Sequence, residues 1–140
     1  MLFIAVMSLL IGYGVKAQDK ELKDKDVPEA VRSAFDKQFD NTMMVDWRMK
    51  DGIYKARFNQ GLKKHTAEFS SSGELLSKGE KIGKDDLPTA VSDAVKISYA
   101  SSNVDEVYRI EKKGQTFYKV KLDNDKKIIY DAQGKVIKEK

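Results

Sequence analysis

The sequence predicts an α+β fold made of two tandem repeats, each one helix followed by a four-stranded antiparallel meander. Three observations lead to this prediction. The segment DVPEAV at residues 26–31 returns about sixty residues later as DLPTAV at residues 86–91. Within each copy the spacing of the apolar residues then changes from three or four to two. Short turns that contain glycine separate the alternating segments, as in antiparallel hairpins.

A helix is predicted at the start of each copy. Asp26 can cap the first helix, and Pro28 lies in its first turn, where its missing N–H costs no hydrogen bond. The apolar residues of both copies share one helical spacing, at Val27, Ala30, Val31, Ala34, Phe35 and Phe39, and at Leu87, Ala90, Val91, Ala94, Val95 and Tyr99. Each set falls on one helical face. Both helices are therefore expected to pack on a shared core.

Strands are predicted after each helix. Val45, Trp47 and Met49 alternate with charged residues, and the second copy has its counterpart at residues 105–112. The following strands are expected at 54–58, 67–69 and 75–76, and at 118–122, 128–130 and 136–137. Two such meanders side by side give one continuous curved sheet of about eight strands. Both helices are expected on one face, which leaves the other face open.

The chain is predicted to contain one domain behind an export signal. The apolar run at residues 2–11 and the Val15-Lys16-Ala17 motif indicate a signal peptide at 1–17, with an uncleaved anchor as the alternative. Residues 18–25 form a charged lead-in that we expect to be disordered. Repeat one is expected at 26–78, a joint at 79–85 and repeat two at 86–140. A cleaved signal would place the protein in the periplasm or outside the cell.

The composition argues against several classes of function. The chain has 26 Lys and Arg against 22 Asp and Glu, and these charges are interspersed. This pattern favours a solubilising surface over a nucleic-acid-binding patch, so no nucleic-acid partner is expected. With 0 Cys, the chain forms no disulfide and has no thiolate nucleophile or thiolate metal ligand.

Neither a catalytic centre nor a metal site is predicted. A Ser-His-Asp hydrolase needs a histidine held by a carboxylate. The sequence has a single histidine, His65, and the matching position of the second copy is Lys126. Asp123-Asn124-Asp125 would place oxygen atoms on a turn, but lysines follow where an EF-hand needs further ligands. Hairpin-turn chemistry explains that tripeptide. We therefore expect no enzyme activity, no metal and no cofactor.

Four motifs recur in both copies: [Val/Leu]-Pro-x-Ala-Val at the helix starts, an aromatic-Arg-apolar strand, a hairpin in which Tyr follows Gly (Gly-x-Tyr, then Gly-x-x-x-Tyr) and a [Phe/Tyr]-x-x-x-Gly-x-[Leu/Val] ending. From Asp26 to the C terminus the chain thereby resembles the PepSY-like family of exported bacterial proteins, which is similar in fold to the tandem-repeat β-lactamase inhibitory protein. The resemblance implies a periplasmic or secreted location. For the better-known relatives it implies binding or inhibition of a protein partner, and it supplies no catalytic residues.

The candidate binding residues are aromatic side chains and the cations beside them. Trp47, Tyr54, Tyr108 and Tyr118 are expected at equivalent positions, followed by Arg48, Lys55, Arg109 and Lys119. Such a row on an open sheet is typical of an interaction surface. Alternation allows a second interpretation, in which the rings face the helices and the cations line the open face. The predicted function is a non-catalytic module that captures a protein or peptide, with a small-ligand carrier or envelope stress protein as the alternative.

Overall fold

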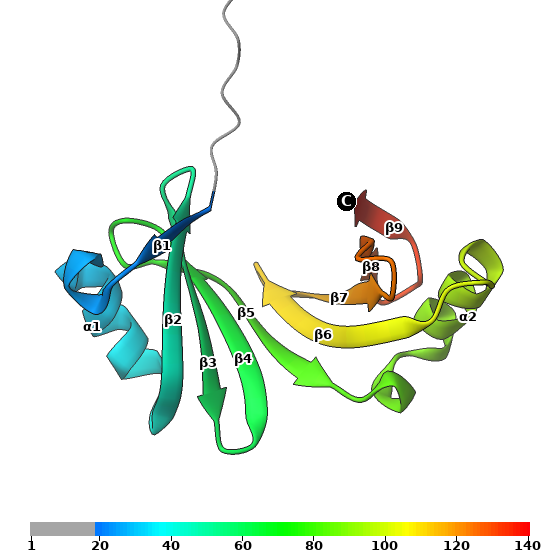
Figure 1. Cartoon of the computed structure of the whole chain (residues 1–140), viewed down its shortest axis with the longest axis horizontal. Coiled ribbons are helices and arrows are strands. Elements are labelled where there is room, and N and C mark those ends of the chain that lie inside the picture. The colour runs from blue at the N-terminus through cyan, green and yellow to red at the C-terminus, as the bar shows by residue number, and fades with distance from the viewer. Residues whose placement is uncertain (1–18) are drawn as a thin grey trace, which may run out of the picture.

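The structure, a computed structural model, describes residues 19–140 (Figure 1). The predicted signal peptide lies outside this range. The described residues form one antiparallel nine-stranded sheet in which every strand pairs with its neighbours in the sequence. The elements are β1 (Lys20–Leu22), α1 (Glu29–Gln38), β2 (Thr42–Lys50), β3 (Ile53–Gln60), β4 (Lys63–Phe69), β5 (Leu75–Ile82), α2 (Thr89–Ser98), β6 (Val104–Lys112), β7 (Gln115–Leu122), β8 (Lys127–Asp131) and β9 (Val136–Glu139). Single 3₁₀ turns at Asp24–Asp26 and Lys84–Asp86 precede the helices. This arrangement confirms the predicted α+β tandem-repeat fold.

Two segments differ from the expectation. The lead-in is not disordered throughout, because β1 pairs with β2 and adds a strand at the edge of the sheet. The expected joint at 79–85 is partly strand, because β5 continues through Gly79 to Ile82 and pairs with both β4 and β6. Gly79 and Gly83 in one short segment are typical of a loop, but Gly79 here lies inside a strand.

Both helices cover the same face of the sheet. Residues paired across antiparallel strands point to the same side, and Trp47, Ala56 and Ala67 form such a row beneath α1. Ala67 pairs with Lys78, and Lys78 with Glu111, so this face continues onto β6. On β6, alternation then puts Val107 on that face, and its row continues through Val120 and Ile128 beneath α2.

The hydrophobic core is divided in two, contrary to the expected shared core. Around α1, the ring of Phe35 lies 5.2 Å from Trp47 and 5.0 Å from Phe58, centroid to centroid. Around α2 the buried residues are mostly aliphatic: Val91, Val95, Val120, Leu122, Ile128 and Tyr130. Between the two cores the helix-side face of β5 and β6 carries ion pairs, Lys78 with Glu111 and Glu80 with Arg109. Each helix therefore stabilises its own half of the sheet.

The same close contact fixes each helix against the last turn of its repeat. Gly73 has φ +87° and Gly134 has φ +84°, a region that glycine adopts without the penalty of other residues. A Cβ atom on Gly73 would lie 2.5 Å from the carbonyl oxygen of Ala30, and one on Gly134 equally close to that of Ala90. The glycines of the two repeat endings thus allow the turns to touch the helices.

We predict that Gly73→Ala lowers the free energy of unfolding by about 2 kcal/mol or more, because it combines backbone strain with a steric clash. The matched control is Gly52→Ala, at φ +74° with nothing within 4 Å of its Cβ position. That variant should lose about 1 kcal/mol from strain alone. Urea unfolding measures both, and equal losses would contradict the steric role of the glycine.

We predict that Tyr130→Phe raises the free energy of unfolding by about 1 kcal/mol, because it removes a buried hydroxyl that has no hydrogen-bond partner among the described residues. Phe69 is the equivalent residue of repeat one: Tyr54 pairs with Phe69 as Tyr118 pairs with Tyr130. The reverse change, Phe69→Tyr, should destabilise the fold. Thermal unfolding of the two variants checks this pair, and a less stable Tyr130→Phe protein would refute it.

Candidate binding site on the concave sheet face

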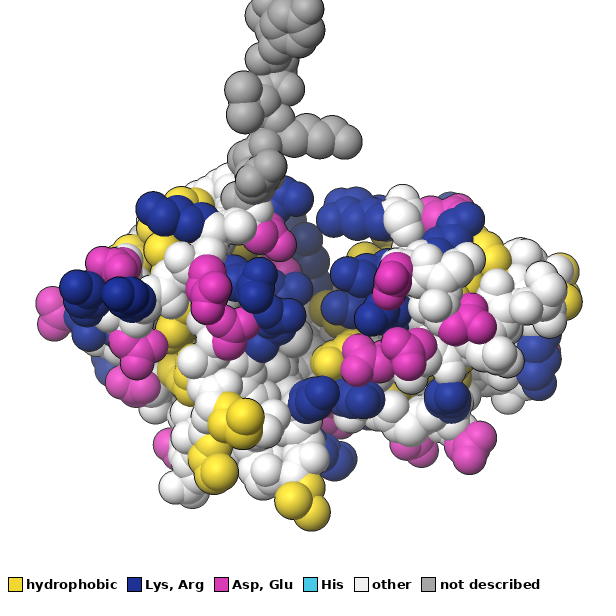
Figure 2. Space-filling view, in the orientation of Figure 1, with side chains coloured by type: hydrophobic (Ala, Val, Ile, Leu, Met, Phe, Trp, Pro, Cys, Tyr) yellow, Lys and Arg dark blue, Asp and Glu magenta, His cyan; other side chains and the backbone are white. Residues whose placement is uncertain are grey.

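The face of the sheet opposite the helices is concave and open (Figures 1 and 2). In a flat sheet, Lys50 at the end of β2 and Lys140 after β9 would be about 33 Å apart, seven strand spacings. Yet Lys138, partial burial and the charge of Lys50 together lower the pKa of Lys140. The charges of the two edges can interact only because the sheet curls toward this face. The result is a hollow whose mouth lies between the edges of the sheet.

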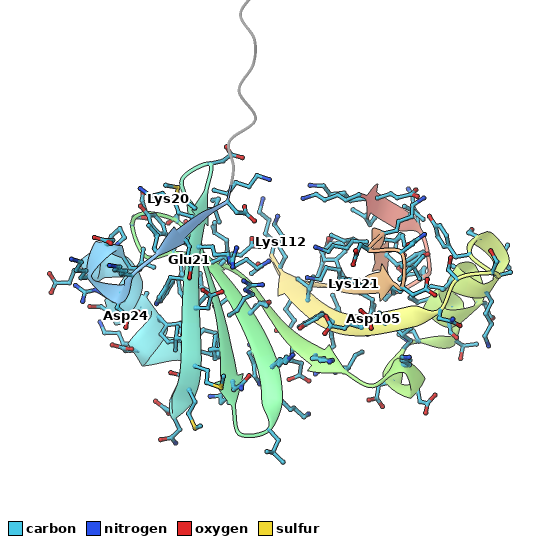
Figure 3. All side chains as sticks on the ribbon, viewed as in Figure 1. Lys20, Glu21, Asp24, Asp105, Lys112 and Lys121 are labelled. Atoms are coloured by element: carbon cyan, nitrogen blue, oxygen red, sulfur yellow. The ribbon has the colours of Figure 1, made fainter. Side chains whose placement is uncertain are left out.

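Basic side chains predominate in the hollow. By strand register its floor and walls carry Arg48, Lys50, Lys55, Arg57, Lys81, Lys112, Lys119, Lys121, Lys127 and Lys138, against Glu21, Asp46, Glu68, Glu106 and Asp131. Figure 3 shows Lys112 at the tip of the β6–β7 hairpin and Lys121 near the other end of the same hairpin, beside Asp105. Cations therefore exceed acids on this face more than in the chain as a whole.

Three of the acids are already bound to cations of the same face. Asp46 accepts a hydrogen bond from Arg57 at 2.7 Å and another from Arg48 at 3.3 Å. Glu68 lies 3.9 Å from the Nζ atom of Lys55, and Glu106 lies 3.4 Å from that of Lys81. These half-exposed pairs contribute little stability. Lys121 pairs with Asp105 and Asp125 at the rim of the hollow. Among the described residues, the lysines that remain without a carboxylate are Lys50, Lys112, Lys119, Lys127 and Lys138.

Lys119 is the clearest of these remaining lysines. Its Nζ atom lies 4.7 Å from the ring centre of Tyr108, a cation–π contact, and it forms no ion pair within residues 19–140. Burial lowers its pKa, as do the positive charges of Lys55 and Lys127, to about 8. Glu106 and Glu68 oppose this decrease more weakly. The centre of the hollow therefore holds a partly dehydrated positive charge beside an aromatic ring.

The structure divides the predicted binding residues between the two faces. Trp47 is buried beneath α1, and Tyr54 and Tyr118 pack against the two cores. Arg109 lies on the helix-side face, where its guanidinium donates a 2.5 Å hydrogen bond to Glu80. Arg48 and Tyr108 lie in the hollow. The six residues thus form no single row, and whether any of them binds a partner stays a prediction.

The division arises because the β6–β7 turn lies two residues farther from the buried pair of its hairpin than the β2–β3 turn does. Trp47 lies five residues before Gly52, whereas Val107, its equivalent by pairing, lies seven before Gly114. Aligning Trp47 with Tyr108 is therefore wrong by one residue, and one residue reverses the face. The sequence signal that finds the hollow is alternation from the buried residues. Counting from Val120, for example, places Lys119 and Lys121 on the open face.

The remaining polar candidates fit structural roles. His65 stacks on Phe58 with ring centroids 5.6 Å apart, and burial lowers its pKa, while Glu80 opposes that shift. In the predicted turn, the Oδ1 atom of Asn124 accepts a hydrogen bond from the Lys126 amide. Among residues 19–140 no three His, Asp or Glu side chains gather as metal ligands do. Nor does this part of the chain contain a helix long and apolar enough to cross a membrane.

Two further cavities offer space for small ligands. One, of about 380 Å³, lies between the start of β5 and the β6–β7 turn, with Leu75 and Leu76 beside charged side chains. The other, of about 270 Å³, lies on the helix-side face between the two cores and is lined by Phe39, His65 and Arg109, among others. Both have mixed linings of apolar and oppositely charged groups, unlike the predominantly basic hollow.

Comparisons with known proteins agree with this architecture. The sequence profile of the family described as "Putative beta-lactamase-inhibitor-like, PepSY-like" matches residues 13–63 and again residues 52–138. No curated protein sequence matches the chain significantly.

Solved structures from Bacteroides share the fold. A DUF2874 family protein from Bacteroides ovatus is 27% identical, with a TM-score of 0.67 over 81% of this chain and 86% of that one. A BLIP-like protein from Bacteroides fragilis is 24% identical, with a TM-score of 0.61 over 81% and 85%. A protein from Bacteroides eggerthii, described as a "putative periplasmic" protein, is 20% identical, with a TM-score of 0.71 over 81% and 88%. Because the family profile matches most of the chain and does so twice, this protein belongs to the PepSY-like, beta-lactamase-inhibitor-like family.

Proposed function

We propose that this protein is a non-catalytic periplasmic binding module that captures an acidic segment of a protein or peptide in its hollow. The observation that carries the proposal is Lys119, a partly buried cation at the centre of the basic face that forms no ion pair among the described residues. A carboxylate from a partner would relieve both the dehydration of this charge and its repulsion by Lys55 and Lys127. Tyr108 beside it adds an aromatic contact of the kind that anchors protein interfaces.

The comparisons support the location and the class of function, and they leave the partner open. The "putative periplasmic" description of the Bacteroides eggerthii protein and the predicted signal peptide favour the periplasm, with secretion as the further possibility. The name of the family and of the Bacteroides fragilis protein favours an inhibitor, in which the hollow would cover an acidic site on an enzyme. A small-ligand carrier is the second candidate, supported by the cavity of about 380 Å³ beside the β6–β7 turn.

We predict that Lys119→Met makes the protein more stable at pH 7, because an apolar side chain of similar length avoids the buried charge. The folded-state pKa of Lys119, about 8, lies below the ordinary value of 10.5. Between these values the unfolded state binds more protons, so this lysine makes stability rise with pH. The advantage of Lys119→Met should therefore be largest below pH 8 and shrink toward pH 10.5.

Urea unfolding of the wild type and Lys119→Met at pH 7, 9 and 10.5 measures this advantage. Lys64→Met is the control. Lys64 is exposed near the start of β4, so the stability of this variant relative to the wild type should not change with pH in this way. A stability difference that does not change with pH would contradict the assignment to Lys119.

We predict that the double variant Lys55→Glu, Lys119→Glu binds its partner at least tenfold more weakly, because both cations would become repulsive to a carboxylate. The immobilised protein is exposed to periplasmic and secreted extract, and retained proteins are identified by mass spectrometry. The matched control is Lys37→Glu, Lys96→Glu, which changes the same net charge on the exposed surfaces of α1 and α2.

A titration of the ¹⁵N-labelled protein with an oligoglutamate peptide locates the site independently of any extract. Amide shifts confined to the strands of the hollow, and lost at high salt, are expected. Retention of the same proteins by the double variant, together with shifts spread over the helices, would overturn the proposal. If only a small molecule shifts residues of the 380 Å³ cavity, the carrier function replaces it.

A further inference from the structure

Three long apolar side chains project into solvent at one end of repeat one. Met43 is 61% exposed, Met44 is 79% exposed and Leu62 is fully exposed. We call these three residues the repeat-one tip. Figure 2 shows hydrophobic side chains protruding at the lower end of the molecule, over the ends of β2, β3 and β4. A protruding apolar group of this kind marks an interaction site more often than an isolated exposed residue does.

Local pairing brings the three side chains to the same end of the sheet. Gln60 pairs with Lys63, so Gly61 and Leu62 form the two-residue turn between β3 and β4. On the other side of β3, Thr42 pairs with Gln60 and Met43 with Asn59. The side-chain amide of Asn59 also donates a 3.5 Å hydrogen bond to the sulfur of Met44. The tip is therefore part of the hairpin framework and not a loose loop.

Met44 is held in an unfavourable backbone conformation. Its φ is +55°, in the left-handed region, at the β-bulge between Met43 and Asp46. A residue other than glycine, asparagine or aspartate is uncommon there and costs about 1 kcal/mol. The strain is stored where the methionine is turned outward to solvent. Strain of this kind collects at sites with a function.

Repeat two shows that the fold does not need an apolar tip. Its β7–β8 turn carries Asp123, Asn124 and Asp125, and its bulge in β6 carries Asp105. The left-handed residue of that turn is Asp125, with φ +66°, where the β3–β4 turn of repeat one has Gly61, with φ +62°. The same structural position is thus apolar in one repeat and acidic in the other.

Lysines flank the repeat-one tip. Lys63 and Lys64 follow Leu62 directly, and both are exposed. Two acids lie nearby. The backbone carbonyl of Asp40 accepts a 2.8 Å hydrogen bond from Gln60, and Asp46, which borders the bulge, is paired with Arg57. Apolar side chains that project beyond two lysines suit an anionic bilayer. The apolar groups would enter the boundary of the acyl chains, and the lysines would contact the headgroups.

We propose that the repeat-one tip docks the protein reversibly on an anionic lipid surface. A protein partner fits less well, because such interfaces bury their apolar side chains in a packed patch with a polar rim, whereas the repeat-one tip projects three long side chains from the end of a hairpin. The acidic turn of repeat two would be repelled by the same lipid surface. Docking would therefore occur through repeat one and leave the hollow, which opens at the other end in Figure 1, accessible.

The test is flotation of the processed chain, residues 18–140, with vesicles of phosphatidylcholine containing phosphatidylglycerol. This chain keeps every residue that the structure describes. The wild type should partition to these vesicles at least tenfold more than to phosphatidylcholine alone, and less as salt rises. Leu62→Asp should reduce the partitioning at least tenfold, and Lys63→Glu with Lys64→Glu should do the same. Circular dichroism confirms that each variant is folded.

Two controls separate the tip from other surfaces. Ile97→Asp removes an apolar side chain that is 83% exposed on α2, and should leave the partitioning unchanged. The double variant Lys55→Glu, Lys119→Glu alters the hollow and should also still bind vesicles. Met44→Gly relieves the left-handed strain, so it should raise stability while it weakens partitioning.

The proposal would be overturned if the wild type bound neither the vesicles with phosphatidylglycerol nor those of phosphatidylcholine alone. Tip variants that partition like the wild type would also overturn it. If only the hollow variant loses partitioning, lipid binding belongs to the hollow. If the tip variants lose a protein partner and the wild type does not bind vesicles, the tip is a protein interface. Neither result depends on whether the hollow captures an acidic partner.

Discussion

The hydrogen-bonded pairing of β5 with β6 is the interaction on which the rest of the structure depends. The two cores are separate, so this ladder joins the halves without a common layer of apolar side chains. On the helix-side face the ladder carries the ion pairs of Lys78 with Glu111 and Glu80 with Arg109, which are partly exposed, and one apolar pair, Ile82 with Val107. Exposed pairs add little free energy. The backbone ladder therefore maintains the continuity of the sheet, the position of the helices on one face and the curvature of the other.

Much of the fold follows from the sequence because the same pattern of apolar residues and turns occurs in both repeats. Helical spacing from Val27 to Phe39 and from Leu87 to Tyr99 identifies the two helices and their buried faces. Alternation and turn chemistry then give the meanders. Two features escape this reasoning. β1 has a polar sequence and exists because it pairs with β2, and β5 contains a glycine at the point where strand and loop signals conflict.

The site is less predictable than the fold, for a physical reason. A binding face is defined by side-chain direction, and direction reverses with a register error of one residue. Tyr108 resembles Trp47 in the motif but occupies the position of Arg48 across the ladder. Curvature is a second missing quantity, because the proximity of Lys55 and Lys119 depends on how four strand spacings bend. No short motif determines side-chain direction or sheet curvature. Both become visible only when every strand is paired with its neighbours.

The divided core also has a mechanical consequence. When two packed layers share one core, tilting them apart opens cavities and is resisted by lost dispersion contacts. Here a change in twist between β5 and β6 would mainly separate partly exposed charged side chains, while each helix stays packed on its own strands. The two repeats can thus rotate as rigid units about the β5–β6 pairing. Substitutions in β5 and β6 therefore offer a way to change the width of the hollow without changing the side chains that line its walls.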